Sequence, residues 1–259
     1  MITESIPLRF AGPNRTALLR EMTGRDEYQV SETNTAQALD LLSSLLEKKS
    51  KTGPDPVQAV DLIAADRDRL LAAVYRRAFG DRIESTLTCA RCDQPFDLFF
   101  SLNRLLASLD EPGSSDCKTL GDGKFETASG VRFRLPTGMD ELAAAGLAPE
   151  EVESLLLSRC LEGGEWPEGR TAFEELVEKV APLLDLELLA PCAECNHIHT
   201  IQFDIQSYVL GAIVAERRRL LAEINRIART YSWSLDEILS LTRSDRRKFV
   251  EIIDNEYVT

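Results

Sequence analysis

The chain has 259 residues, which is enough to bury a substantial core in one large domain or two small ones. Hydrophobic residues make up 44% and charged residues 28%, an ordinary globular composition that excludes fibrous and low-complexity proteins. The 30 Lys and Arg residues against 43 Asp and Glu residues give a net charge of -13, which repels nucleic acid and anionic membranes at long range.

The first residues carry no basic segment followed by an apolar one, so no secretory signal is expected. The longest apolar run that we find, residues 208–215, is far shorter than the roughly 20 residues of a membrane span. We therefore expect a cytoplasmic protein that does not enter a membrane.

Residues 1–88 are expected to form a mainly helical N-terminal region. Apolar side chains recur at helical spacing over residues 34–49, and again over residues 64–79, after which Gly80 supplies a stop. Residues 82–88 carry apolar and β-branched side chains, and they predict a short strand that runs into Cys89.

Residues 110–190 are expected to form an acidic inserted α+β unit that opens with a linker at 110–115. Its 18 acidic and 7 basic residues give a net charge of -11, most of the negative charge of the chain. The turn candidate Ser129-Gly130 predicts a hairpin that joins Phe125 to a strand with Phe133. Helical periodicity follows over residues 142–147, 149–161 and 171–184.

Residues 207–259 are expected to form C-terminal helices. Residues 207–228 read as one amphipathic helix, Ser234 and Glu237 form a capping box for a second helix, and a last helix begins near Ser244.

Two CxxC pairs are the strongest local signal in the sequence. Two residues between thiolates let a tight turn direct both sulfurs at one ion, so Cys89, Cys92, Cys192 and Cys195 predict one four-sulfur structural zinc site per chain. The surroundings of the pairs match at an offset of 103 residues, which indicates two related knuckles about an approximate two-fold axis. Two alternatives stay open: a redox dithiol, and four buried thiols without metal.

The predicted fold is therefore α+β and mostly helical, with a split zinc-ribbon-like core. The first knuckle spans residues 89–109 and the second spans residues 191–206, with the acidic unit inserted between them. Long insertions cost little loop entropy when their own ends lie close together.

The remaining cysteines and histidines give weaker signals. Cys160 lies on a helical apolar stripe and is expected to pack as a small hydrophobe, and Cys117 stands alone. His197 and His199 could replace a thiolate as ligand or serve in a catalytic site, but their alternation in a strand-like stretch favours residues that face solvent beside the second knuckle. Nucleotide-binding, hydrolase and metalloprotease motifs are absent, so we expect neither an enzyme nor a small-molecule substrate.

An arginine and aromatic cluster near the C-terminus predicts a protein interface. We assign partner binding to Tyr231, Trp233, Arg246 and Arg247. Two alternatives stay open. One is a solvated helix face whose arginines pair with Glu216, Glu223, Asp236 and Asp245. The other is a zinc-ribbon nucleic-acid adaptor, which predicts salt-sensitive binding to DNA or RNA.

Several segments carry a resemblance to a known family: residues 18–27 (LLREMTGRDE), 66–71 (DRDRLL), 80–83 (GDRI), 134–138 (RLPTG), 224–229 (INRIAR), 231–234 (YSWS) and 237–241 (EILSL), with the two CxxC pairs and Arg246-Arg247. They resemble the T-even-type baseplate hub assembly chaperone family of contractile phage tails and related extracellular contractile injection systems. The resemblance implies a non-enzymatic factor that helps baseplate or hub proteins assemble. It also implies a location in the cytoplasm or in the assembled tail.

Overall fold

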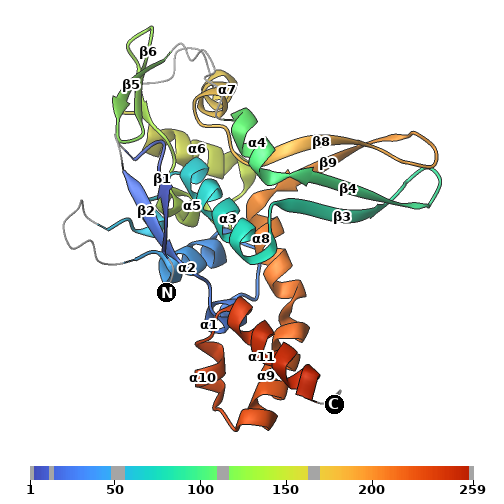
Figure 1. Ribbon diagram of the computed structural model, residues 1–259. Coiled ribbons are helices and arrows are strands. Elements are labelled where there is room, and N and C mark those ends of the chain that lie inside the picture. Colours follow the sequence, from blue (N-terminus) through green and yellow to red (C-terminus); the bar gives the residue numbers. More distant parts are fainter. Residues whose placement is uncertain (1–2, 12–14, 48–55, 110–116, 163–169, 257–259) are drawn as a thin grey trace.

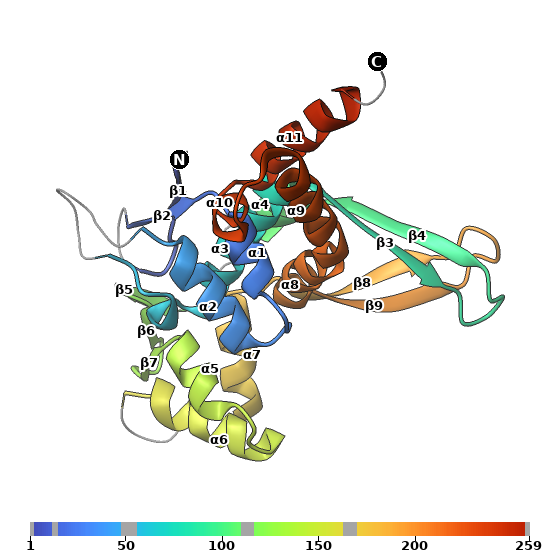
Figure 2. The ribbon, with the colours of Figure 1, turned by 90° about the horizontal axis from the view of Figure 1, so that it is seen from below.

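The computed structural model describes residues 3–11, 15–47, 56–109, 117–162 and 170–256. It has a mixed α/β body, an arm of two hairpins that projects from the body, and a separate group of helices at the C-terminus (Figure 1). The view from below shows that the acidic insert and the arm leave the body in different directions (Figure 2). The predicted linker at 110–115 lies outside the described residues.

The N-terminal part of the body combines a hairpin with three helical elements: β1 (Thr3–Pro7), β2 (Thr16–Arg20), α1 (Gly24–Gln29), α2 (Thr35–Leu45) and α3 (Ala64–Phe79), with the 3-10 turn η1 (Ala59–Asp61) before α3. Asn34 caps α2 by accepting the Gln37 N–H, and Gly80 ends α3 with a φ of 96°. Both predicted helices are confirmed. The β1–β2 hairpin was not expected from the sequence.

The main core lies between these helices and the base of the arm. Leu70 and Leu71 of α3 are fully buried, as are Leu42 of α2 and Leu210 of the later helix α8 (Ile205–Ala215). These residues belong to one hydrophobic cluster. Helix α3 therefore packs against a helix from the other end of the sequence.

The acidic insert forms a three-stranded antiparallel sheet, β5 (Cys117–Gly121), β6 (Lys124–Thr127) and β7 (Arg132–Arg134), followed by α5 (Gly138–Ala144), α6 (Pro149–Cys160) and α7 (Arg170–Val180). The predicted hairpin is the β6–β7 pair, in which Phe125 lies opposite Phe133. A second hydrophobic cluster joins both rings to Cys160 and Phe173. Cys160 is buried there, as expected for a packing residue, and burial raises the pKa of its thiol to about 11.

The arm consists of two antiparallel hairpins, β3 (Arg82–Thr88) with β4 (Pro95–Ser101), and β8 (Asp185–Pro191) with β9 (Ile198–Asp204). The register of each follows the predicted offset of 103, since Arg82 pairs with Ser101 and Asp185 pairs with Asp204. Each hairpin leads directly into a helix, α4 (Leu102–Leu109) or α8. The matching rings Phe100 and Phe203 contact each other edge to face, with centroids 5.0 Å apart.

The C-terminal unit, residues 217–256, contains α9 (Arg217–Tyr231), α10 (Leu235–Leu239) and α11 (Arg243–Glu256). Its small core is a separate cluster around Ile227, Ile238 and Ile253. The helix predicted over residues 207–228 is present as α8 and α9, which are separated by the single residue Glu216, whose backbone stays in the right-handed helical region with a φ of -79° and a ψ of -2°.

The architecture corrects the predicted place of the cysteine knuckles. They lie at the end of a projecting arm, whereas the core lies in the body. Each knuckle unit also includes the strand before its first cysteine, so the units span 82–101 and 185–204. Among the described residues, no helix is long and apolar enough to cross a membrane.

Candidate metal centre

Each hairpin ends in the same tight turn. The Cys89 N–H donates to the Gln94 carbonyl and the Asp93 N–H to the Cys89 carbonyl, both at 2.9 Å. The second turn repeats these bonds, from Cys192 to His197 at 2.8 Å and from Asn196 to Cys192 at 3.0 Å. Asp93 and Asn196 each have a φ of 55°, which Asp and Asn tolerate better than most residues. Backbone geometry therefore places both cysteines of a pair on one side of the turn.

The four sulfurs of the two turns come together at the end of the arm. All lie within 4.8 Å of one another. Cys89 Sγ is 3.6 Å from Cys195 Sγ, and Cys92 Sγ is 3.8 Å from Cys192 Sγ. A tetrahedral zinc ion with Zn–S bonds of about 2.3 Å requires S···S distances of about 3.8 Å. The donor set and its spacing therefore fit a four-coordinate metal ion.

The electrostatics of the cluster favour a cation. Burial raises the pKa of the Cys89 thiol, but N–H groups of Arg91 and Cys92 and the ring of His199 lower it more, so the net shift is downward to about 5. The Gln94 N–H lowers the pKa of the Cys92 thiol, but burial and the neighbouring thiols of Cys195, Cys89 and Cys192 raise it more, so the net shift of this pKa is upward. Four thiolates at this distance repel one another, so a bound cation is what lets all four ionise.

The two histidines lie beside the sulfur cluster at the end of the arm, partly covered by neighbouring side chains. His199 places Nε2 3.3 Å from Cys89 Sγ, and its ring stacks on Phe96 with centroids 4.9 Å apart. His197 contacts the His199 ring edge to face. Both are half-buried, so the expectation of solvent-facing histidines is wrong. His199 is placed to hydrogen-bond a ligating sulfur, as residues around metal ligands commonly do.

The structure separates the four residues assigned to partner binding. Arg246 is 0% exposed, and its guanidinium donates to Glu27 at 2.8 Å, Glu223 at 3.0 Å and the Leu241 carbonyl at 3.0 Å. The prediction that Arg246 contacts a partner is therefore wrong, because its side chain is buried and its N–H groups donate to residues of the same chain.

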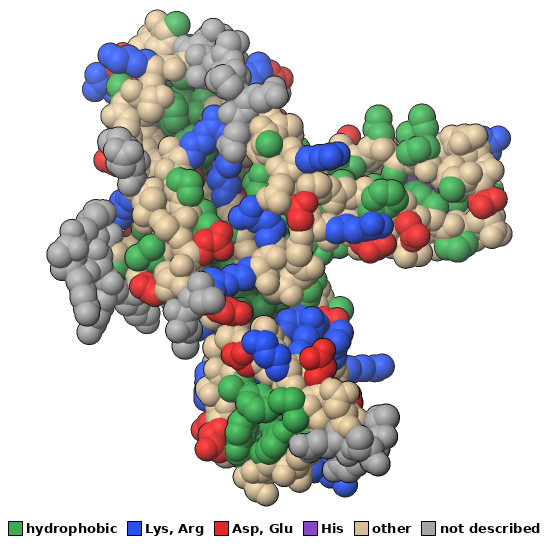
Figure 3. All heavy atoms as spheres, in the orientation of Figure 1, with side chains coloured by type: hydrophobic (Ala, Val, Ile, Leu, Met, Phe, Trp, Pro, Cys, Tyr) green, Lys and Arg blue, Asp and Glu red, His purple; other side chains and the backbone are tan. Residues whose placement is uncertain are grey.

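Tyr231 and Trp233 are half-buried in the core of the C-terminal unit, where both rings contact Phe249. Hydrophobic side chains reach the surface of this unit (Figure 3). Arg226, Arg243 and Arg246 are paired with carboxylates of the same chain, as in the alternative of internally paired arginines.

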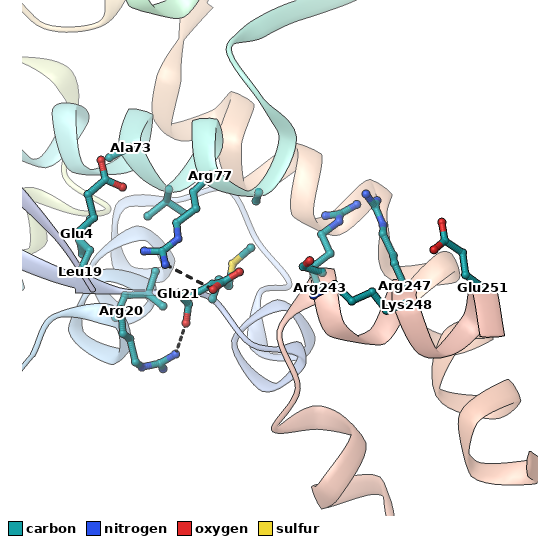
Figure 4. Close-up of a pocket in the computed structure, with 15 residues that line it drawn as sticks. Glu4, Leu19, Arg20, Glu21, Ala73, Arg77, Arg243, Arg247, Lys248 and Glu251 are labelled. Atoms are coloured by element: carbon teal, nitrogen blue, oxygen red, sulfur yellow. Dashed lines mark hydrogen bonds and ion pairs between the residues drawn. The ribbon is translucent and has the colours of Figure 1, made fainter. Parts of the chain in front are cut away.

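Arg247 lines a cleft of about 350 Å³ between the body and α11 (Figure 4). The body side carries apolar residues such as Leu19 and Met22, and α11 contributes Arg243 and Lys248. Arg247 reaches Glu216 at 3.8 Å. The partner-binding assignments of Tyr231, Trp233 and Arg247 stay predictions.

Sequence reasoning missed Glu27, one of the two carboxylates that hold Arg246. A signal for Glu27 was present, because the pattern R-x-x-T-G-x-D-E occurs at residues 20–27 and again at 134–141. Two copies of a pattern of that length in one chain indicate that both segments have the same structural role. Glu223, the other carboxylate, is among the acidic partners named in the alternative of internally paired arginines.

A comparison with known protein families identifies the family of the chain. The model of the family described as "T4 bacteriophage base plate protein" matches residues 11–163, more than half of the chain, and this range includes the arm hairpin β3–β4 and most of the acidic insert. No curated protein and no solved structure matches the chain.

Proposed function

Because the chain belongs to the T4 bacteriophage base plate protein family, we propose that it is a non-enzymatic factor that helps a contractile-tail baseplate assemble by docking to other baseplate proteins. The family match is the observation that carries this proposal. It supports baseplate proteins as the partners and a location in the assembled tail. A cytoplasmic stage before assembly is part of our proposal. The assembly role is the further step that we add.

The shape of the molecule supports a docking role. The arm and the C-terminal unit extend from the body, so they offer surfaces that can enter recesses of a partner (Figure 1). The net charge of -13 speeds encounter with basic surfaces and disfavours premature self-association through acidic faces.

The outer face of the second hairpin is the docking surface that we assign. Leu189 is 71% exposed and Ile198 is 60% exposed, on neighbouring strands. Leu188 and Ala190 face the other hairpin, which leaves Leu189 outward by the alternation of a strand. Hydrophobic side chains protrude along the arm (Figure 3). Exposed apolar residues on a projecting element are typical of a protein interaction site.

We further propose that the metal is zinc and that it is structural. Four thiolates would fill a tetrahedral zinc shell, which leaves no open position for a water or a substrate. The ion would tie the two hairpins together at the arm's end, and this rigid arm would then present Leu189 and Ile198 to the partner. The absence of an open position supports a non-enzymatic role.

Capture from cells that make the tail tests the docking proposal. We expect the tagged wild-type chain to retain other baseplate proteins, and the double variant Leu189→Asp with Ile198→Asp to lose them. Glu187→Ala, on the same exposed strand face, is the matched control and should behave as wild type. If the wild-type chain retains no baseplate protein, the docking function is wrong. If the arm variant retains them fully, the arm assignment is wrong.

A further inference from the structure

An apolar groove of about 430 Å³, the insert groove, lies between the helices α6 and α7 of the acidic insert. Its floor comes from the start of α3 and from the connection between β7 and α5, where Ile63, Ala65 and Leu135 are buried. Cys160 and Phe173, which belong to the second hydrophobic cluster, also line it. The insert groove is therefore an open side of that cluster.

The two walls of the insert groove have helical spacing. Helix α6 contributes Glu153, Leu156, Leu157 and Cys160, which are spaced as i, i+3, i+4 and i+7. Helix α7 contributes Val177 and the residues one turn before and one turn after it. Residues seven positions apart lie about 11 Å apart along a helix axis, so each wall is about two turns long. The side chains of a third helix fit between such rows.

The apolar side chains of the walls are not fully covered. Leu156, Leu157 and Val177 are half-buried, and Leu183 at the end of the insert groove is 36% exposed. Apolar surface that is surrounded by polar residues is typical of a protein interaction site. A partner that fills the insert groove removes these side chains from water, which favours binding.

The rim of the insert groove is uniformly acidic. Five carboxylates from four elements line it: Glu141 of α5, Glu153 of α6, Glu174 and Glu178 of α7, and Asp185 of β8. Among the described residues, none of the side chains that line it is a lysine or an arginine. The cleft lined by Arg247 differs, because five cationic side chains and three carboxylates line it. The charge of the rim therefore favours a cationic partner.

The carboxylates of α7 are the ones most open to a partner. Glu174 and Glu178 are exposed and lie one turn apart, a spacing at which like charges destabilise a helix. Among the described residues, neither forms an ion pair, whereas Glu141 pairs with Arg67. A basic side chain placed between Glu174 and Glu178 would relieve their repulsion.

From this geometry we propose that the insert groove binds a basic amphipathic helix of a protein partner. Apolar residues of that helix fill the groove over about two turns, and its flanking lysines or arginines pair with Glu174 and Glu178. This proposal names the chemistry of a docking partner, and it rests on the docking function proposed above.

The chain itself is a poorer occupant of the insert groove. A second copy has a net charge of -13, and residues 163–169 contain two glutamates and no basic residue. The chain has a basic amphipathic helix in α9, but the apolar residues Leu220 and Ile227 of α9 are already buried. Opposite charge and an available apolar face are therefore expected in another protein.

Fluorescence anisotropy with a labelled model peptide and the full-length chain tests this proposal. The peptide has about 18 residues, with leucines on one helix face and lysines on the other, and the control peptide has glutamates in place of the lysines. We expect the leucine–lysine peptide to bind with a micromolar dissociation constant, and the leucine–glutamate peptide not to bind.

Two sets of variants locate the binding. Glu174→Gln with Glu178→Gln should weaken binding of the leucine–lysine peptide about three- to tenfold, because each exposed charge pair contributes little. The matched control is Glu175→Gln with Glu187→Gln, which removes two exposed carboxylates outside the insert groove and should bind as wild type. Val177→Trp fills the groove without changing charge, and should weaken binding at least about tenfold.

Three results would overturn the proposal: no binding of the leucine–lysine peptide, equal binding of the leucine–glutamate peptide, or binding that neither Val177→Trp nor the double variant of α7 changes. A dimer of the wild-type chain that Val177→Trp dissociates would also overturn it, since a second copy would then occupy the groove. Because the probe is a model peptide, its failure to bind refutes the groove assignment alone. Failure of the wild-type chain to retain baseplate proteins, with peptide binding intact, refutes the baseplate function alone.

Discussion

The buried ion pair of Arg246 gives the sharpest prediction about stability. Arg246→Met fills a similar volume but removes the cation paired with Glu27, which is 5% exposed, and leaves Glu223, which is 6% exposed, with Arg219 at 3.6 Å. Removing one partner of a buried pair costs about 3–5 kcal/mol, because a buried charge is left uncompensated. We expect that cost to fall on the docking of the C-terminal unit to α1 and on the packing of α11 against α9, since Arg246 binds Glu27 of α1 and Glu223 of α9.

Hydrogen exchange measured along the chain separates this effect from global unfolding. In Arg246→Met, amides of α1 and of the first turn of α11 should lose protection corresponding to about 3 kcal/mol or more, whereas α3 should keep its protection. The double variant Arg246→Met with Glu27→Gln should be less destabilised than the sum of the single variants, because the two groups interact directly. A loss below about 1 kcal/mol, or equal loss in α3, would refute the reasoning.

Three further predictions follow from other buried groups. Burial raises the pKa of Asp68 to about 6, above its value of about 4 in the unfolded chain. The protonated carboxyl therefore stabilises the fold fully below pH 4, and the free energy of unfolding should fall by up to about 3 kcal/mol as the pH rises through 6. In urea unfolding at pH 4 to 7, Asp68→Asn should reduce that fall, and an unchanged pH profile would contradict the assignment. Phe133→Ala empties a fully buried site between Phe125 and Phe173, and should cost about 3–5 kcal/mol by chemical denaturation; a cost under about 1 kcal/mol would show that the insert's core lies elsewhere. Protein purified without a chelator should contain about one zinc per chain and lose thermal stability when a strong chelator is added, whereas metal-free protein with unchanged melting would remove the proposed zinc site.

The sequence predicted those elements whose structure depends mainly on residues close together in the chain. Helix α3 was predicted because it has a strong apolar stripe and ends at a glycine. The CxxC spacing and the offset of 103 residues predicted that the two knuckles lie together and have matching turns. The β1–β2 hairpin was missed because its strands are short and each has only one or two fully buried positions. The division at Glu216 could not be predicted from the sequence, since no residue there opposes a helix.

The candidate sites show a similar limit. The four cysteines could be assigned together because thiolates at that spacing have few other uses. Arg246 was misassigned because an arginine beside other basic residues on an amphipathic helix resembles an exposed interface residue. Its burial depends on Glu27, 219 residues earlier in the chain, and only the repeated R-x-x-T-G-x-D-E pattern hints at that contact.

Production of tails in cells that lack this chain tests the central claim most directly. The proposed function predicts that sheathed tails with complete baseplates are not formed, and that the wild-type chain supplied separately restores them. Electron microscopy and mass spectrometry of purified particles measure both results. Complete, contractile tails formed in normal number without the chain would contradict a role in baseplate assembly.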